Sequence, residues 1–157
     1  MNHYTGNKTN WKSNNVAKQM TPKERAALSK SMKDSRERTQ QATLKSFKHK
    51  ANRVDQLLTV MPKATDDNSY LKSKGIKASD NVYEDKKGRL VVPITDVKGK
   101  NQSIARINST GSFKGYLKGG KKAGGMHMVG KPQDGKPILV AEGYSTAKTL
   151  NLSLIHI

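Results

Sequence analysis

Hydrophobic residues recur every three or four positions in the first part of the chain. Between residues 44 and 61 they form an apolar stripe at helical spacing: Leu44, Phe47, Ala51, Val54, Leu57, Leu58 and Met61. Further upstream, Thr21, Pro22 and Glu24 fit the N-cap, the first helical position and the reciprocal acceptor of a capping box. No proline or glycine follows until Pro62, so the pattern predicts one long helix, or two helices, over about 22–60.

Beyond residue 62, short β-prone runs replace the helical pattern. Residues 62–69 have the composition of a linker, and the next segment is typical of a short helix that ends at Gly75. Turn signals then separate runs rich in β-branched and aromatic residues. We expect strands at about 89–94, 103–107, 113–117, 126–129 and 137–141. The first three of these predict an antiparallel β-meander.

The last apolar run, Pro137–Ala141, leads directly into Glu142 and Gly143, and a helix is expected from about Thr146. A buried strand that ends in a carboxylate is common in the active sites of α/β sheets. Glu142 could then act as a general acid or base, or bind a metal. A solvated glutamate at an ordinary strand end fits the same pattern, so these residues alone leave both interpretations open.

The composition indicates a polyanionic partner. The 157 residues include 30 Lys and Arg against 12 Asp and Glu, which gives a net charge of +18 with a hydrophobic fraction of 33%. A basic surface gains affinity from the counterions that neutralised phosphates release, so nucleic acid is the expected partner. An acidic membrane surface is the competing partner, but no basic segment has the apolar face of an interfacial helix.

Other classes of site and location are excluded or disfavoured by single residue types. The chain has no cysteine, which excludes disulfides and Cys-ligated zinc, and its four histidines are too scattered for a His-rich site. No apolar run approaches the length of a membrane span, and residues 1–20 do not resemble a signal peptide. We therefore expect a cytoplasmic protein without membrane association.

Basic residues supply a second group of candidates. In the loop 118–125, four glycines flank Lys121 and Lys122, whose ammonium groups could cradle phosphates together with backbone N–H groups. The loop lacks the spacing of a P-loop, and a solvated hairpin loop is the alternative. Arg106 and Lys114 lie on the strands that lead into it and would extend the basic surface, unless each is simply solvated.

Two further features are open to a bland and a functional interpretation. His127 alternates with apolar neighbours, which favours a structural role over catalysis. The segment 1–20 is basic and polar, with Tyr4 and Trp11 as its sizeable aromatics. These residues suit non-specific binding of a nucleic-acid backbone, and a solubilising tail fits equally well.

Taken together, the ordered motifs carry a resemblance to a known family. They are Tyr70–Ile76, Gly88–Ile94, Asp96–Gly99, Arg106–Lys114, Gly119–Gly130 and Ile138–Ala147. In this order they resemble the Toprim-containing DNA primases of plasmids and phages, over about residues 62–151. The resemblance implies synthesis of short RNA primers on single-stranded DNA in plasmid, phage or mobile-element replication. The implied partners are single-stranded DNA and NTPs, with a replicative helicase as a further candidate.

The same resemblance implies roles for individual residues. Glu142 would serve in phosphodiester chemistry as a general acid or base, or as part of a Mg²⁺ site. Template and incoming nucleotides would be bound by Arg106, Lys114, Lys121 and Lys122. Relatives often carry Gln where this chain has Ala105, which puts a contact there in doubt.

Several features that the family uses are absent. No acidic residue follows Glu142, so the Asp-x-Asp pair that holds Mg²⁺ in Toprim enzymes is missing, as is the zinc module of many primases. The closing residues 152–157 look like translated adaptor sequence, and we expect that the chain stops within its Toprim domain, folds incompletely there and is itself inactive. A non-catalytic single-strand-binding protein, or another Toprim enzyme such as a nuclease or topoisomerase-like protein, are the alternatives.

The predicted fold class is α+β, in four parts. A disordered basic arm at 1–20 precedes a long helical region at 21–61. A basic β-rich primase subdomain at 62–136 contains the antiparallel meander, and residues 137–157 would supply the first β-α unit of a Toprim α/β fold.

Overall fold

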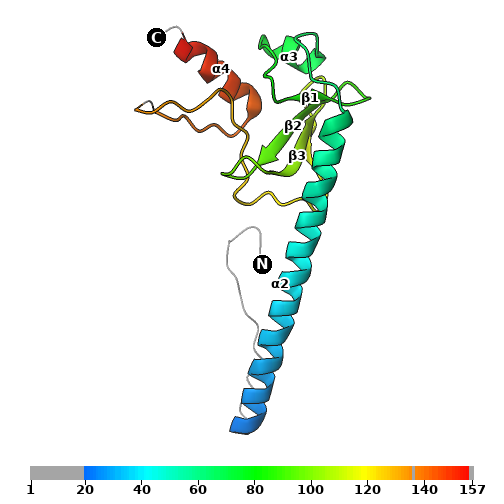
Figure 1. The fold of residues 1–157 in the computed structure, drawn as a ribbon, viewed down its shortest axis with the longest axis vertical. Helices are drawn as coiled ribbons and strands as arrows, with labels where there is room; N and C mark the ends of the chain where they lie inside the picture. The colour runs from blue at the N-terminus through cyan, green and yellow to red at the C-terminus, as the bar shows by residue number, and fades with distance from the viewer. Residues whose placement is uncertain (1–19, 136, 156–157) are drawn as a thin grey trace. The chain divides into compact units, whose positions relative to one another are not determined.

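A computed structural model describes residues 20–135 and 137–155 of the chain (Figure 1). The helices and strands, in chain order, are α2 (Pro22–Val60), α3 (Ser69–Lys74), β1 (Tyr83–Glu84), β2 (Leu90–Thr95), β3 (Asn101–Ile107), β4 (Lys114–Tyr116) and α4 (Tyr144–Ile155). The chain divides into two compact units between Thr43 and Leu44. The α+β class is confirmed. The predicted basic arm lies almost entirely outside the described residues.

The first unit contains the N-terminal part of α2, which begins as its capping pattern predicts. The backbone N–H and the hydroxyl of Thr21 donate to Glu24 Oε2 at 2.7 and 2.9 Å, and the N–H of Glu24 donates to Thr21 Oγ1 at 3.3 Å. The bond from the Thr21 backbone, followed by that from its hydroxyl, lowers the pKa of Glu24. Helix α2 then continues without interruption to Val60, so the prediction of one long helix is confirmed.

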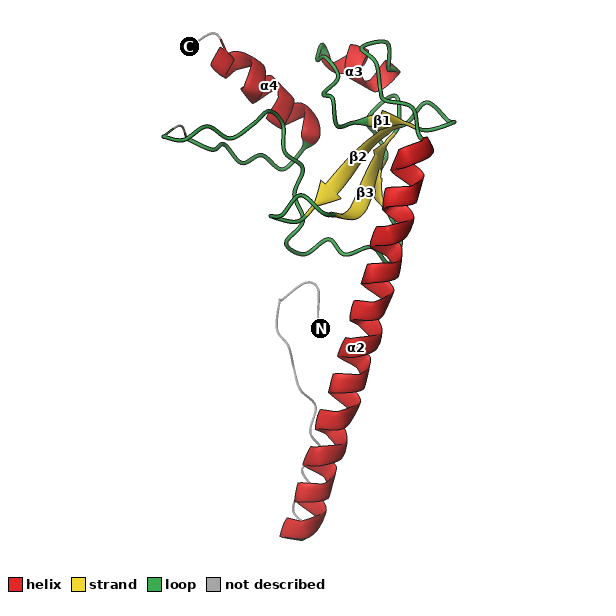
Figure 2. Cartoon of the chain, viewed as in Figure 1, coloured by secondary structure: helices red, strands yellow, loops and turns green. Residues whose placement is uncertain are grey.

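In the second unit, four antiparallel strands form an open sheet in the order β1-β2-β3-β4. Figure 2 labels the first three of these strands. The three strands of the predicted meander are confirmed with boundary shifts of a few residues. The two-residue strand β1 was not predicted, because its pairing with Val91 and Leu90 has no local signal. The strand expected at 126–129 is reduced to a single bridge between Thr95 and Met126.

Strand β2 lies between β1 and β3 and is buried on both of its sides. One side, called here the α3 side, carries Leu90, Val92 and Ile107, and these share a cluster with Tyr70 and Leu71 of α3 and Tyr144 of α4. The opposite α2 side carries Val91 and Ile104, which pack with Val54 and Leu58 near the end of α2. Helix α3 ends as predicted at Gly75, whose φ of 62° lies in the left-handed region.

The prediction of a buried strand at 137–141 is wrong. These residues form no strand, and the side chains of Ile138 and Val140 are 75% and 93% exposed. A strand is stable only with a neighbour that accepts its backbone hydrogen bonds, and no described segment pairs with this run. Of the expected β-α unit, only the helix is formed, and α4 begins at Tyr144, close to the predicted start.

Candidate nucleic-acid interface

The antiparallel register divides the predicted basic residues between the two sides of the sheet. Lys114 pairs with Ile107 and Tyr116 with Ala105, so both of these β4 residues lie on the α3 side. Arg106 alternates with these positions and lies on the α2 side, opposite Gly115. The predicted residues therefore form two groups rather than one surface.

Lys114, Tyr116 and Lys122 make up the first group, called here the Tyr116 surface. The ammonium Nζ of Lys122 lies 4.7 Å from the centroid of the Tyr116 ring, at cation–π distance. The Tyr116 side chain is about half exposed, and Lys114 is the next residue on the same side of the strand. A half-exposed aromatic ring with basic residues on the same side of the sheet can stack on a nucleobase while the lysines contact phosphates.

The glycine-rich loop that carries Lys121 and Lys122 is fixed to the sheet. Its two turns are closed by hydrogen bonds of 3.0 Å from the N–H of Gly120 to Leu117 O and from the N–H of Gly125 to Lys122 O. Gly120 packs on Ser103 so closely that a Cβ atom would collide with the serine hydroxyl, and Gly125 packs in the same way on Ile94.

Ser103 and Ile94 are cross-strand partners, so the loop crosses the α3 side of the sheet at that pair. The N–H groups of Gly120 and Gly125 are used within the turns, so these two do not contribute to the phosphate cradle considered from the sequence. Lys121 and Lys122 supply the ammonium groups of this loop.

Glu142 is exposed, and within residues 20–135 and 137–155 it makes no hydrogen bond or ion pair. It directly precedes α4, where the carbonyl of Gly143 accepts a hydrogen bond of 3.0 Å from the N–H of Ala147. The Nζ atom of Lys114 lies 4.0 Å from the position that a Cβ atom on Gly143 would occupy. The structure thus places Lys114, and with it the Tyr116 surface, beside the backbone next to Glu142.

The described residues do not make up a metal site around this glutamate. No group of three or more His, Asp or Glu side chains capable of holding a metal ion occurs in the described part of the chain. Glu142 offers one carboxylate, and its neighbourhood includes the ammonium of Lys114, which competes with a cation. The Mg²⁺ implied by the resemblance stays a prediction.

Arg106 belongs to a separate charged cluster on the α2 side. Its Nε atom lies 3.8 Å from Asp85 Oδ2, whereas Arg89 binds the same oxygen at 2.7 Å through a terminal nitrogen and at 2.8 Å through Nε. Burial tends to raise the pKa of Asp85. The hydrogen bonds from the Arg89 side chain and from the N–H groups of Arg89 and Lys87 outweigh it and lower that pKa. Asp85 is therefore held mainly by Arg89, and Arg106 is only loosely engaged.

Two aromatic residues of this region were not among the predicted site residues. Phe113 and Tyr116 are 51% and 53% exposed, and neither belongs to the two hydrophobic clusters. The ring of Phe113 lies against Gly115, where its Cζ atom is 2.5 Å from the position of a Cβ atom. The run Phe113-Lys114-Gly115-Tyr116, with aromatic residues alternating with small and basic ones, was the available signal.

His127 links α4 to the sheet in a structural role. Its Nδ1 atom lies 2.9 Å from the carbonyl oxygen of Pro93, which can only accept, so Nδ1 carries the proton. Its ring meets Tyr144 edge to face with the centroids 5.5 Å apart, and the Tyr144 hydroxyl lies 3.0 Å from Ser79 Oγ. Burial lowers the pKa of His127 more than the hydrogen bond to Pro93 raises it. The residue is thus kept neutral, as a packing group.

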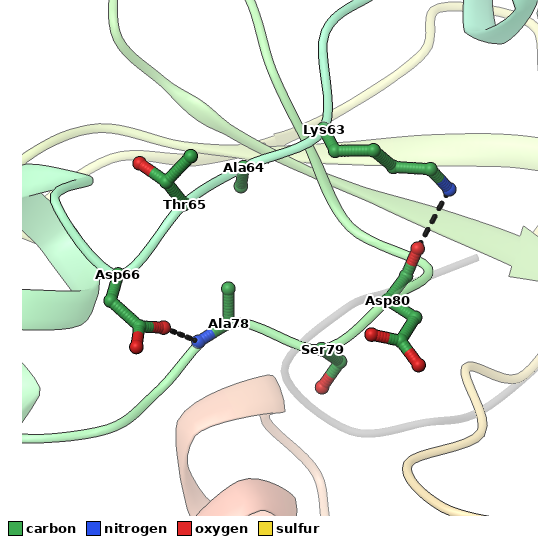
Figure 3. A pocket seen from close by; sticks show the side chains of 7 residues that line it. All are labelled: Lys63, Ala64, Thr65, Asp66, Ala78, Ser79 and Asp80. Atoms are coloured by element: carbon green, nitrogen blue, oxygen red, sulfur yellow. Dashed lines mark hydrogen bonds between the residues drawn. The ribbon is translucent and has the colours of Figure 1, made fainter.

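A pocket elsewhere in the second unit contains none of the predicted site residues. It is lined by Lys63, Ala64, Thr65, Asp66, Ala78, Ser79 and Asp80 (Figure 3). Lys63 Nζ donates to the carbonyl oxygen of Asp80 at 2.7 Å, and Asp66 Oδ1 accepts from the N–H of Ala78 at 2.8 Å (Figure 3). These bonds tie the two segments of the pocket wall together. The polar groups of Lys63 and Asp66 thus have a structural role that requires no ligand.

Comparison with known proteins adds no family assignment. No family model matches the chain, and no solved structure matches it. The resemblance to primases accordingly depends on the sequence motifs alone.

No helix within the described ranges is both long and apolar enough to cross a membrane.

Proposed function

We propose that this chain binds single-stranded nucleic acid through the Tyr116 surface, as the template-binding part of a Toprim primase-like protein. The observation that carries the proposal is the position of the Lys122 ammonium over the half-exposed Tyr116 ring, with Lys114 beside it on the same side of β4. This arrangement offers a stacking face for a base and cations for the flanking phosphates.

The charge of the whole chain supports the same ligand. A net charge of +18 attracts a polyanion from any direction, but this attraction reads neither sequence nor strandedness. The loop fixed by Gly120 and Gly125 gives the surface a defined position on the sheet, so the lysines are preorganised for phosphate contacts.

Primer synthesis is the catalytic part of the proposal, and one contact favours it. Lys114 Nζ approaches Gly143, so an anion bound at the Tyr116 surface would lie next to Glu142. In a primase-like enzyme this neighbourhood would hold the template or an incoming NTP, with Mg²⁺ as the implied cofactor and Glu142 as the acid–base group. A DNA-binding protein without catalysis, and a Toprim nuclease or topoisomerase-like enzyme, remain alternatives.

Binding is tested with a fluorescein-labelled 12-nucleotide single strand titrated with the chain over a series of salt concentrations. We expect the logarithm of the binding constant to fall linearly with the logarithm of salt concentration, and Lys114→Ala and Lys122→Ala each to reduce the slope by about 0.7. Lys86→Ala is the matched control, because this exposed lysine lies in the turn between β1 and β2, at the opposite edge of the sheet.

Two results would overturn the binding proposal: absence of salt-dependent binding, or an equal effect of Lys86→Ala. The catalytic part is tested separately, by primer synthesis from NTPs and Mg²⁺ with the protein expressed from its gene. Glu142→Gln should abolish synthesis and leave single-strand binding unchanged. If the protein makes no oligoribonucleotides but still binds single strands, a non-catalytic binding protein is the correct interpretation.

A further inference from the structure

We propose that β4 is a two-sided base-stacking platform, on which Tyr116 and Phe113 stack unpaired bases on opposite sides of the sheet. This inference rests on the proposed function and deepens it, because it names unpaired nucleobases as the groups that are recognised. A ligand of this kind is a single strand that passes around the edge of the sheet.

The position of β4 makes both of its sides accessible at one edge. Strand order places it last, bonded to β3 on one side, and no described strand pairs with its outer edge. It is only three residues long, Lys114–Tyr116, so a flexible chain can cross it. Natural sheets often protect such edges with lysines, which here would also attract phosphates.

The two rings lie on opposite sides of this strand. Tyr116 lies on the α3 side with Lys114, whereas the Phe113 ring lies against Gly115, the residue that faces the α2 side. The glycine at residue 115 leaves room for the Phe113 ring on the α2 side, since a Cβ atom on this residue would occupy the space of that ring. A side chain at residue 115 would therefore displace Phe113.

The backbone of Phe113 is anchored before any ligand arrives, and each ring shares its side of the sheet with a basic residue. The N–H of Phe113 donates to Asn108 Oδ1 at 3.1 Å, and its carbonyl accepts from the N–H of Asn108 at 3.1 Å. Arg106 is the register partner of Gly115 and thus shares the side of Phe113, while Lys122 lies over Tyr116. An anchored backbone loses little conformational entropy on binding.

The Phe113 and Tyr116 rings are exposed and lie outside the hydrophobic clusters, which points to a ligand that covers them. Phe113 and Tyr116 are 51% and 53% exposed within four residues of each other and contribute to neither hydrophobic cluster. Large aromatic side chains left in water next to cations are typical of single-strand-binding surfaces. A duplex keeps its bases stacked inside and could meet the lysines but not both rings.

The test compares three ligands of equal length: (dT)12, a 12-residue abasic strand and a 12-base-pair duplex, each fluorescein-labelled. We expect Phe113→Leu and Tyr116→Leu each to weaken binding of (dT)12 by about 5- to 100-fold and to leave the abasic strand and the duplex almost unchanged. The double variant should show the product of the two single effects, because the rings act on separate bases.

Three more variants separate stacking from misfolding. Tyr116→Trp keeps a larger stacking surface and should bind (dT)12 at least as well as the unaltered chain. Gly115→Ala should lower (dT)12 affinity as Phe113→Leu does, although no aromatic residue is removed. Val97→Ala, at an 81% exposed apolar residue away from β4, should have no effect.

The platform is overturned if the leucine variants bind (dT)12 as the unaltered chain does, or if they lose the abasic strand equally. In both cases single-strand binding by the lysines of the Tyr116 surface stands as long as Lys114→Ala and Lys122→Ala still reduce binding, but Tyr116 is then not a stacking group. Failure of the unaltered chain to bind any of the three ligands overturns the proposed function and the platform together.

Discussion

The Nζ atom of Lys122 lies 4.7 Å from the centre of the Tyr116 ring, although the two residues belong to different elements. Tyr116 ends β4, whereas Lys122 lies in the loop that returns across the sheet. The contact therefore depends on the two glycines that hold this loop down, and it connects loop packing with ligand binding.

We expect Lys122→Ala to weaken single-strand binding more than Lys121→Ala does. Both changes remove one positive charge from the same loop, but only Lys122 lies over a ring that could stack on a base. Lys122→Arg should retain most of the affinity, because a guanidinium also forms cation–π contacts. Fluorescence anisotropy at two salt concentrations measures the three variants, and equal losses for the two alanine variants would contradict a specific role for residue 122.

Gly125→Ala should destabilise the second unit by about 1–3 kcal/mol, the usual cost of overpacking. A methyl group at this position would collide with the Ile94 side chain, which is buried in the central strand. Urea denaturation followed by circular dichroism gives the free energy of unfolding.

Gly143→Ala is the matched control for this change. A Cβ atom on Gly143 would have no neighbour closer than 3.9 Å, and the residue is not among those with positive φ. We expect its stability to remain within about 0.5 kcal/mol of the unaltered chain, as for most surface changes. Equal destabilisation by both substitutions would show that the contact between the loop and Ile94 is not what matters.

Local signals explain which parts of the fold were predictable. The start of α2 depends on Thr21 and Glu24, which are three residues apart, and the end of α3 depends on the left-handed φ of Gly75. The meander follows from turns that are closed within a few residues, such as the bond from the N–H of Gly99 to Asp96 O. Because each of these interactions joins residues that are close together in the sequence, the sequence alone is enough to predict it.

Non-local partners explain what was missed. The apolar run at 137–141 has the composition of a strand, but pairing decides whether a strand forms. In contrast, β1 has no local strand signal and forms because it pairs with β2. Lys122 lies over the Tyr116 ring and Lys114 shares its side of β4, whereas alternation puts Arg106 on the other side of the sheet. The exposure of Phe113 and Tyr116 could not be predicted, since it depends on which sides of the sheet the helices cover.

The free energy of unfolding should decrease as the pH falls through 6.5 and on through the lowered pKa of His127. Burial keeps this pKa below the value of 6.5 expected for an unperturbed histidine. In that pH window the unfolded chain binds a proton more readily than the folded chain, so acid favours unfolding. Urea titrations at several pH values between about 5 and 8 measure the effect, centred on the ordinary histidine range.

His127→Phe serves as the non-titrating comparison. It keeps an aromatic ring against Tyr144 but loses the hydrogen bond to the carbonyl of Pro93, so its stability should be lower at pH 8. Its stability should also change less with pH over the same range. A pH dependence as large as that of the unaltered chain would assign the effect to another group.

Asp85→Asn should lower the free energy of unfolding at neutral pH by about 1–3 kcal/mol, because it removes the charge that holds Arg89 and leaves both arginines beside a neutral amide. The Asp85 side chain is only 11% exposed and bonds Arg89 at 2.7 Å, so solvent screens this pair little. Asp67→Asn is the matched control, since its ion pair with Lys72 is exposed and screened by solvent, and its loss should lower the free energy of unfolding much less.

The same carboxylate predicts a second pH effect in the acid range. The pKa of Asp85 is lowered in the folded chain below the ordinary value of 3.8, so its contribution is complete above that value and is lost as the pH falls through the lowered pKa. Asp85→Asn should remove this part of the acid sensitivity and leave the decrease below pH 6.5 that we assign to His127. If the variant loses stability between pH 4 and 2 as steeply as the unaltered chain, Asp85 is not the group that titrates.

Arg106 is only loosely bound to Asp85, at 3.8 Å. The release of Arg106 in Asp85→Asn should therefore not weaken binding of (dT)12.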